Sequence, residues 1–302
     1  MAGQDRLRPM PATVVQAPPA DRAYRPLQRN SGLRLTRCQC RAGRHAPPVD
    51  EQHQAFSVTL VERGVFTYRS PAGQAVLSPG WLMLANDGEG YTCSHEHNDG
   101  QGDDCAVLGI SPQRMDALQS ALGQRSAGKV FRRASLPPMP RVAALLKTLL
   151  ADGDEGFALE ETALAVVGAV QHTLNNESAP PPAAAQSERA LAAARHIEGH
   201  ATEPLSLDEV AAVVGLGSFH LMRTFRHSMG VTPHQYLIRL RLLRAVELLR
   251  DSALPVTSVA YEAGWADLSN FIRTFQREIG CSPRDFRRSD RKMLRTPAPS
   301  SR

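Results

Sequence analysis

The stretch that decides the fold of the C-terminal third is LDEVAAVVGLGSFHLMRTFRHSMGVTPHQY, residues 207–236, which returns in altered form as PVTSVAYEAGWADLSNFIRTFQREIGCSPRDF, residues 255–286. The tripeptide Arg-Thr-Phe stands at 223–225 and again at 273–275. The Gly and Pro that follow it return at the same offset, whereas the Val-Ala pair and the Gly that precede it return one residue closer. Because a repeat indicates one structural unit used twice, this pattern sets the architecture of the region.

Each copy predicts two short helices joined at a glycine. In the first copy, apolar residues between 210 and 214 form one helix face. Gly215 then provides a turn conformation that a residue with a β-carbon adopts only at a cost. The next helix carries Leu221 and Phe225 on one buried face, because they are four residues apart. The pattern therefore predicts a helix-turn-helix unit in each copy.

The ends of the predicted helices differ between the copies. Asp267 stands where the N-cap of the second helix belongs in the second copy, and Gly217, a weaker cap, stands there in the first. Thr232-Pro233 begins a long connecting helix over about residues 234–250. We expect this helix to hold the two units rigidly together. A plain helical bundle is the alternative, and two copies with this spacing argue against it.

Residues 187–288 resemble the DNA-binding domain of AraC/XylS-type transcription regulators. The second copy carries most of that family's signature: Gly264, an aromatic residue at 265, Ser269, Phe271, Arg273, Phe275, Gly280, Ser282-Pro283 and Phe286-Arg287. Three positions depart from the pattern, with Trp265 for the usual Phe, Gln276 for a basic residue and Gly217 for Ser. The resemblance covers about a third of the chain. It implies that the second helix of each unit enters the DNA major groove.

The resemblance also implies two surfaces that read bases. The first comprises Ser218, Phe219, Met222 and Arg223, and the second comprises Leu268, Ser269, Asn270 and Arg273. These positions lie near the N-terminal ends of their helices and away from the buried Phe faces, which agrees with such a role. Arginine can bind a guanine edge and asparagine an adenine edge, whereas Arg226 is better placed for a phosphate. A solvated surface charge is the alternative for each arginine, and recurrence in both copies favours the DNA contact.

The overall charge is a weaker guide to a nucleic-acid partner. The chain of 302 residues has room for two domains, and its net charge of +5 suits a polyanion. Residues 188–290, however, hold 13 Arg against 12 Asp plus Glu, so the excess lies in the leader and the tail. The sequence shows no apolar run for a membrane span or a signal peptide, so we expect a cytoplasmic protein without a membrane partner. Its five cysteines then indicate thiols or ligands rather than a disulfide framework.

The expected fold class is α+β, with a cupin-like antiparallel β-barrel and following helices before an all-α double helix-turn-helix domain. Short alternating runs between residues 33 and 110 predict the strands, and apolar spacing from Pro140 onward predicts the helices. The barrel and dimerisation assignments follow the usual domain order of AraC/XylS-type regulators. The expected segments are a disordered leader (1–26), a cupin-like sensing barrel (27–115), a helical dimerisation region (116–177), a Pro/Ala linker (178–187), the DNA-binding domain (188–290) and a basic tail (291–302).

One group in the front half predicts metal or thiol chemistry: Cys93, His95, His97 and Cys105. On a strand, residues two apart share a face, so the first three are expected to point the same way. The following loop would turn the chain back in a hairpin and place Cys105 opposite His97. Two thiols and two imidazoles suit zinc or another transition metal, and Cys40 or Cys38 could substitute or form a redox pair. Buried cysteines that pack as small apolar residues, with solvated histidines, remain the alternative.

The leading interpretation is a sequence-specific transcription regulator whose barrel senses an effector and thereby biases DNA binding. Its expected partners are double-stranded DNA, a second copy of the chain, a small-molecule, metal or redox effector and, for an activator, RNA polymerase. A cupin-type metalloenzyme fused to a DNA-binding domain is the second class, but the Glu and later His of the cupin metal site are missing. A DNA-repair fusion is the third, and the four closely set cysteines of its zinc site are missing. We therefore expect no catalytic residue, and no cofactor beyond a transition metal such as zinc.

Overall fold

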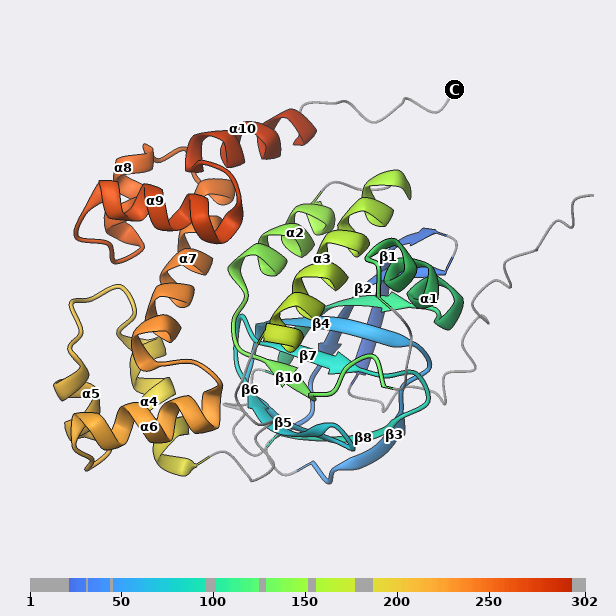
Figure 1. The fold of residues 1–302 in the computed structure, drawn as a ribbon, viewed down its shortest axis with the longest axis horizontal. Helices are drawn as coiled ribbons and strands as arrows, with labels where there is room; N and C mark the ends of the chain where they lie inside the picture. Colours follow the sequence, from blue (N-terminus) through green and yellow to red (C-terminus); the bar gives the residue numbers. More distant parts are fainter. Residues whose placement is uncertain are drawn as a thin grey trace, which may run out of the picture. The chain divides into compact units, whose positions relative to one another are not determined.

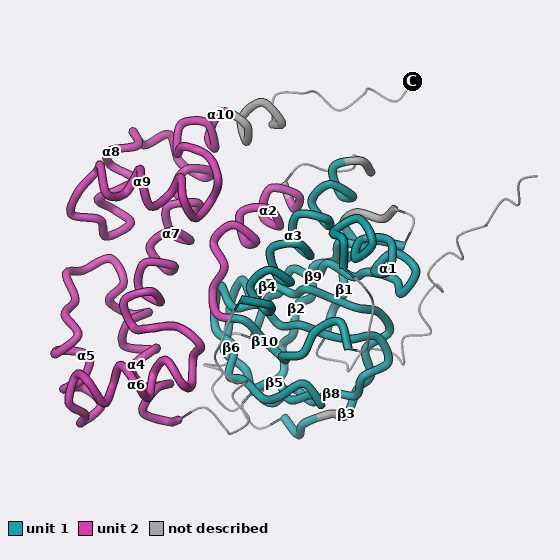
Figure 2. Tube along the Cα trace, viewed as in Figure 1, with its two compact units in different colours: residues 1–136, 153–184 teal, residues 137–152, 185–302 magenta. Residues whose placement is uncertain are grey.

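The computed structural model describes residues 22–30, 32–43, 46–95, 102–124, 129–151, 156–176 and 187–294 (Figure 1). The chain divides into two compact units, of which unit 1 comprises residues 1–136 and 153–184 and unit 2 comprises residues 137–152 and 185–302 (Figure 2). Unit 1 contains antiparallel sheets and helices, and the regular elements in the described part of unit 2 are all helices. The predicted fold class is therefore confirmed. Within the described ranges, no helix has the length and apolar character needed to cross a membrane.

The strands of unit 1 form two antiparallel sheets. Their bounds are β1 Arg22–Asn30, β2 Leu33–Cys40, β3 Val49–Gln52, β4 Phe56–Arg63, β5 Phe66–Ser70, β6 Gly73–Leu77, β7 Leu82–Ala85, β8 Gly90–Ser94, β9 Asp103–Ile110 and β10 Ser135–Leu136. The larger sheet has the order β1-β2-β9-β4-β7-β10, and the smaller sheet has the order β3-β8-β5-β6. Apolar side chains of both sheets are fully buried, among them Leu35 and Leu108 in the larger and Tyr68 and Leu77 in the smaller. Burial of these side chains is the main favourable term for folding of this unit.

The first strand corrects the predicted extent of the disordered leader. Residues 22–26 belong to β1, which pairs with β2 from Arg22 opposite Cys40 to Asn30 opposite Leu33. The strand is an edge strand, and its register shifts between Pro26 and Gln28, as expected of a proline that cannot donate to the ladder. Backbone pairing with β2 holds this strand although few of its residues are apolar, so apolar alternation in the sequence does not indicate it. Residues 1–21 lie outside the described residues.

The predicted hairpin between residues 93 and 105 is wrong. β8 pairs with β3 and β5, whereas β9 pairs with β2 and β4. The chain thus passes from one sheet to the other between these strands, and Cys105 lies opposite Cys38 and Val61. Alternation along a strand indicates which residues share a face, but it does not reveal which strand lies beside it. His97 lies outside the described residues.

The helices after the sheets are divided between the two units. In unit 1, α1 spans Pro112–Ala121, and α3 spans Gly156–Asn176 and packs against β1 and β2. α2 spans Pro140–Ala151 and belongs to unit 2, where it packs against the helices of the C-terminal region. The predicted helical region 116–177 is therefore shared between the units. The predicted linker lies outside the described residues except for Ser187.

Unit 2 contains the two copies of the sequence repeat. Its further helices are α4 Glu188–Gly199, α5 Leu207–Val213, α6 Ser218–Met229, α7 Pro233–Asp251, α8 Val256–Glu262, α9 Leu268–Ile279 and α10 Pro283–Leu294. The first copy builds α5 and α6, the second builds α8 and α9, and α7 connects them. α7 begins after Thr232, whose Oγ1 accepts a hydrogen bond of 3.2 Å from the Gln235 backbone N–H. Tyr236 and Val246 on its inner face are fully buried, which confirms the predicted connecting helix.

Candidate nucleic-acid interface

In the first helix-turn-helix unit, α5 has a capped N-terminus, and a turn that contains a glycine connects α5 to α6. Ser206 Oγ accepts a hydrogen bond of 3.2 Å from the Glu209 N–H, and Glu209 Oε2 accepts one of 2.7 Å from the Ser206 N–H. The bond from the Ser206 N–H, together with one of 2.8 Å from the Ser206 hydroxyl to the same carboxylate oxygen, lowers the pKa of Glu209. After α5, Gly215 adopts a φ of +63°, in the left-handed region that favours glycine. The turn therefore sets the orientation of α6 relative to α5.

α6 has one buried face and one exposed face. Leu221 and Phe225 are fully buried, and the Phe225 ring meets the Tyr236 ring of α7 edge-on with centroids 5.6 Å apart. On the opposite face, Phe219 is 74% exposed and Met222 is 38% exposed. The exposed residues at 219, 222, 223 and 226 follow the three- and four-residue spacing of one helix face. Four of the five residues predicted for the first unit thus lie together in one exposed row.

Ser218, the fifth predicted residue of this unit, lies at the start of α6 and is partly exposed. Its hydroxyl donates a hydrogen bond to the Asp208 carboxylate in the first turn of α5. Gly217, immediately before it, provides no side-chain cap. Ser218 therefore ties the two helices of the unit together, and its hydroxyl oxygen still has capacity to accept a further hydrogen bond.

The second helix of the second helix-turn-helix unit, α9, is anchored by aromatic residues. Phe271 and Phe275 are fully buried, with ring centroids 5.6 Å apart, and Trp265 and Phe286 extend the cluster at 5.7 and 5.8 Å. Asp267 Oδ1 accepts a hydrogen bond of 2.6 Å from the Asn270 N–H, which confirms the predicted cap. These contacts fix both the start and the inner face of α9.

The predicted reading residues of α9 fall into two groups. Ser269, Asn270 and Arg273 are exposed. Leu268, by contrast, is partly buried and packs against the hydrophobic core of unit 2. Its equivalent in the first copy is Ser218, so the shared position does not lead to the same environment. The structure brings three of the four residues to the surface of α9.

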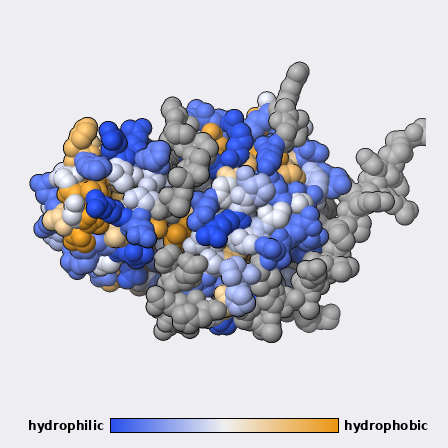
Figure 3. All heavy atoms as spheres, turned by 90° about the horizontal axis from the view of Figure 1, so that it is seen from below, coloured by the Kyte–Doolittle hydropathy of each residue, from blue (hydrophilic) through white to orange (hydrophobic). Residues whose placement is uncertain are grey.

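Hydrophobic residues also reach the surface of unit 2. Figure 3 shows hydrophobic side chains gathered on its left side, where Figure 1 places the helices of unit 2. The large apolar residues exposed in the described part of this unit are Leu207, Val213, Phe219, Met222 and Tyr261. Phe219 and Met222 lie in the row of α6 that also carries the arginines, and apolar side chains in such a row can meet the methyl group of thymine.

α6 and α9 carry two further basic residues that are not among those predicted from the sequence. His227 and Arg277 occupy the same position of the two copies, in the last turn of α6 and α9, and both are exposed. Arg277 Nε donates to the Glu278 carboxylate at 3.0 Å. Basic residues at a helix C-terminus interact favourably with its dipole, which is their structural role. Their recurrence at one offset is the signal that could have marked them as candidate phosphate contacts.

The residues of the predicted metal group are separated in unit 1. Cys93 lies on β8, Cys105 lies on β9, and His95 follows the end of β8. Burial raises the pKa of the Cys93 and Cys105 thiols above the usual range. Among the described residues, Cys40, His95 and Asp103 form a group of three His, Cys or acidic residues whose donor atoms all lie within 4.8 Å of one another. The structure thus joins His95 to Cys40, the predicted substitute, and to Asp103, which the sequence had not indicated.

Comparison with known proteins concerns mainly the C-terminal region. A family model described as a helix-turn-helix domain matches residues 210–289. The HTH-type transcriptional activator RhaS of Escherichia coli O139:H28 is 42% identical over 91 residues, which are 30% of this chain and 33% of that protein. The chain therefore matches only about a third of the length of its curated relatives.

Solved structures with similarity to the chain cover different parts of it. The DNA-binding domain of AdpA, in complex with a target DNA, is 27% identical and covers 37% of this chain and 100% of that chain, with a TM-score of 0.35. ToxT of Vibrio cholerae is 11% identical and covers 86% of this chain and 98% of that chain, with a TM-score of 0.37.

Proposed function

Because residues 210–289 match a helix-turn-helix domain and are similar to an HTH-type transcriptional activator, we propose that the chain is an AraC-type, sequence-specific transcription regulator that acts in the cytoplasm. The observation that carries this proposal is the pair of reading helices. α6 and α9 each present exposed polar or basic residues opposite a buried aromatic face. One chain therefore offers two DNA-reading surfaces without needing a dyad.

The two surfaces differ in chemistry and so suit unlike half-sites. Arg223 and Arg273 stand at equivalent positions and can each bind a guanine through two hydrogen bonds. Phe219 on α6 suits a thymine methyl group, whereas Asn270 on α9 suits adenine. Arg226, a turn further along α6, is suited to a phosphate, which positions the helix without reading sequence. A single subunit would thus read an asymmetric site across two successive turns on one face of the DNA.

Control of DNA binding falls to unit 1 in this proposal. A small-molecule, metal or redox effector bound by the β-sheet unit would bias the regulator between states that differ in DNA affinity. A second copy of the chain would bind through the helical region 116–177, and an activator would contact RNA polymerase. The buried thiols and the His95 cluster of unit 1 support an effector site in this part of the chain.

The proposal is tested by selection from a pool of random DNA duplexes, in which those bound by the purified full chain are recovered and sequenced. We expect an asymmetric site with two unlike halves. Arg273→Ala should weaken binding to the selected site about 5- to 150-fold and relax the preference at one base pair of one half. Arg226→Ala should instead weaken binding to all sequences alike and reduce the salt slope by about 1.

A matched control comes from the connecting helix. Arg244 on α7 is exposed and lies 3.7 Å from the Glu247 carboxylate, outside both reading helices. Arg244→Ala should therefore leave the selected site and its affinity nearly unchanged. Binding without sequence preference would contradict the proposed function, and so would equal losses on Arg244→Ala and Arg273→Ala.

A further inference from the structure

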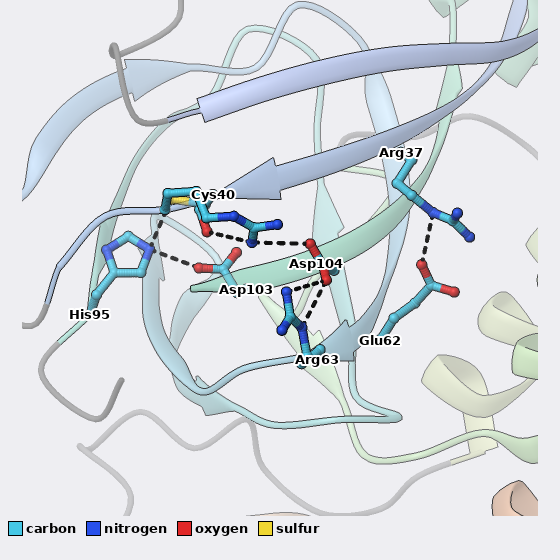
Figure 4. A network of polar contacts seen from close by, with 8 residues as sticks. Arg37, Cys40, Glu62, Arg63, His95, Asp103 and Asp104 are labelled. Atoms are coloured by element: carbon cyan, nitrogen blue, oxygen red, sulfur yellow. Dashed lines mark hydrogen bonds and ion pairs between the residues drawn. The ribbon is translucent and has the colours of Figure 1, made fainter. Parts of the chain in front are cut away.

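Three donor side chains converge in the interior of unit 1. Figure 4 shows Cys40, His95 and Asp103 pointing toward one another. His95 Nε2 lies 3.5 Å from Cys40 Sγ and 3.1 Å from Asp103 Oδ2. Cys40 is the last residue of β2, Asp103 is the first residue of β9, and His95 follows the last residue of β8. The group therefore joins the ends of strands from both sheets.

All three side chains are withdrawn from water. Cys40 is 2% exposed, and His95 and Asp103 are each 5% exposed. Asp103 Oδ2 makes no well-directed hydrogen bond within the described part of the chain, although it lies close to the imidazole. A neutral or protonated ring carries at most one proton on Nε2, so it cannot donate fully to both the sulfur and the carboxylate. A cation between the three atoms would satisfy all of them at once.

The distances agree with those between ligands of one metal ion. Zinc binds Cys sulfur at about 2.3 Å, His nitrogen at about 2.0–2.1 Å and carboxylate oxygen at about 2.0–2.2 Å. At tetrahedral angles these lengths separate sulfur from nitrogen by about 3.5 Å and nitrogen from oxygen by about 3.4 Å. The observed separations are 3.5 Å and 3.1 Å. Both separations from His95 Nε2 thus lie within a few tenths of an ångström of those expected around one ion, and the donor atoms of all three residues lie within 4.8 Å of one another.

The backbone around the cluster fixes the direction of Asp103. Asp104, the next residue on β9, points to the opposite face, where its carboxylate pairs with Arg63 at 2.7 Å and Arg41 at 3.4 Å (Figure 4). Gly102 has a φ of +77°, and a β-carbon there would lie 2.2 Å from the Cys40 carbonyl oxygen. The ends of β2 and β9 are therefore held in close contact, with Cys40 and Asp103 turned toward His95.

We propose that Cys40, His95 and Asp103 bind a zinc(II) ion. A thiolate, an imidazole and a carboxylate form a donor set of the kind zinc prefers, whereas magnesium and calcium favour oxygen donors alone. Three protein ligands leave the fourth tetrahedral position for water or an exogenous ligand. Within the proposed function, which this inference deepens, the ion is the site in unit 1 where an effector acts. Cys93, which is half-buried, and Cys105, which is buried, stay outside the coordination sphere.

Metal titration of the full chain, stripped with a chelator and kept free of DNA, tests this site. We expect one equivalent of zinc(II) per chain and, with cobalt(II) alone, a near-ultraviolet charge-transfer band from thiolate to metal. Cys40→Ser and Asp103→Asn should each weaken zinc binding by more than about 100-fold, the upper range for loss of an outer-sphere partner. Cys40→Ser should also remove the cobalt band. The matched controls, Cys93→Ser and Cys105→Ser, should retain both the stoichiometry and the band.

Several results would overturn the site. One is that the native chain takes up no zinc, and another is that its cobalt spectrum lacks the thiolate band. A third is that Cys93→Ser or Cys105→Ser loses metal binding while Cys40→Ser still binds. A cobalt spectrum of the native chain without the thiolate band overturns the site even where a variant fails to fold. Trp81 fluorescence during unfolding, in a Trp265→Phe background, checks the fold of each variant. Because no DNA is present, a negative result leaves the DNA-reading proposal untouched, and a failed DNA selection leaves the metal measurement valid.

Discussion

The two helix-turn-helix units share a fold, but their turn glycines stand in different surroundings. Gly215 in the first unit has a φ of +63°, and a β-carbon added there would meet no atom within 4 Å. Gly264 in the second unit has a φ of +89°, and its β-carbon would lie 2.8 Å from both the Ala201 carbonyl oxygen and Thr202 Cα. The first glycine is needed for conformation alone, whereas the second is needed for conformation and for space.

The crowding at Gly264 has a structural cause in the segment after α4. Arg241 of α7 donates hydrogen bonds to the carbonyl oxygens of Ala201, at 2.7 Å, and Glu203, at 2.8 Å. These bonds hold the segment against the second turn. The two turns look equivalent in the repeat, but we expect them to tolerate substitution differently. Only the turn at Gly264 is packed against another segment of unit 2.

Substitution of the two glycines should show the largest difference between the units. Gly264→Ala should destabilise unit 2 by about 2–5 kcal/mol, because left-handed strain adds to a clash with backbone atoms that cannot move aside. Gly215→Ala should cost only about 1–2 kcal/mol, from strain alone. Denaturant unfolding followed by Trp265 fluorescence, in a Trp81→Phe background, measures both.

Hydrogen–deuterium exchange locates the effect of each glycine substitution. Gly264→Ala should expose amides of α8 and α9, and Gly215→Ala should affect α5 and α6. Equal destabilisation by the two changes would show that the segment at residues 201–203 moves away freely, and the distinction between the turns would fail.

The two proposed reading surfaces offer a second contrast, in base preference. Asn270→Ala should weaken binding to the selected DNA site by about 1–3 kcal/mol, since a paired contact to adenine is lost. Phe219→Ala should cost about 1 kcal/mol, the lower end of that range, since it removes only apolar contact with a thymine methyl group. Quantitative binding to single-base variants of the site measures both. Each substitution should alter preference in one half of the site, and a change in the same half by both would contradict two separate reading helices.

The parts of the fold that the sequence predicts are those that local signals encode. The glycines at 215 and 264, the Asp267 cap and the spacing of the phenylalanines act within a few residues of chain, so helix positions in unit 2 follow from them. Leu268 marks the limit of this reasoning. It shares a repeat position with Ser218, but it packs against the core because neighbouring aromatic residues of the second unit create a surface for it.

The parts of unit 1 that escape prediction depend on contacts between distant segments. Cys40 and Asp103 meet only because β2 pairs with β9, and His95 joins them only because the chain crosses between sheets after β8. Adjacent Asp103 and Asp104 look alike in sequence, whereas strand alternation buries one and exposes the other to arginines. Side chains two apart on a strand could be grouped from sequence, but partners across a sheet could not.

The caps of α6 and α9 provide the smallest contrast between the two helix-turn-helix units. Asp267→Ala should cost about 1 kcal/mol, because its carboxylate satisfies the Asn270 N–H. Gly217→Ser should gain at most about 1 kcal/mol, since Gly217 has an extended conformation with a φ of −75° that any residue can adopt. A β-carbon at 217 meets no atom within 4 Å. The same unfolding measurement on Trp265 follows both changes. A higher free energy of unfolding for Gly217→Ser would show that the first helix-turn-helix unit lacks only a cap. An unchanged value would mean that the bond from Ser218 to Asp208 already stabilises the start of α6.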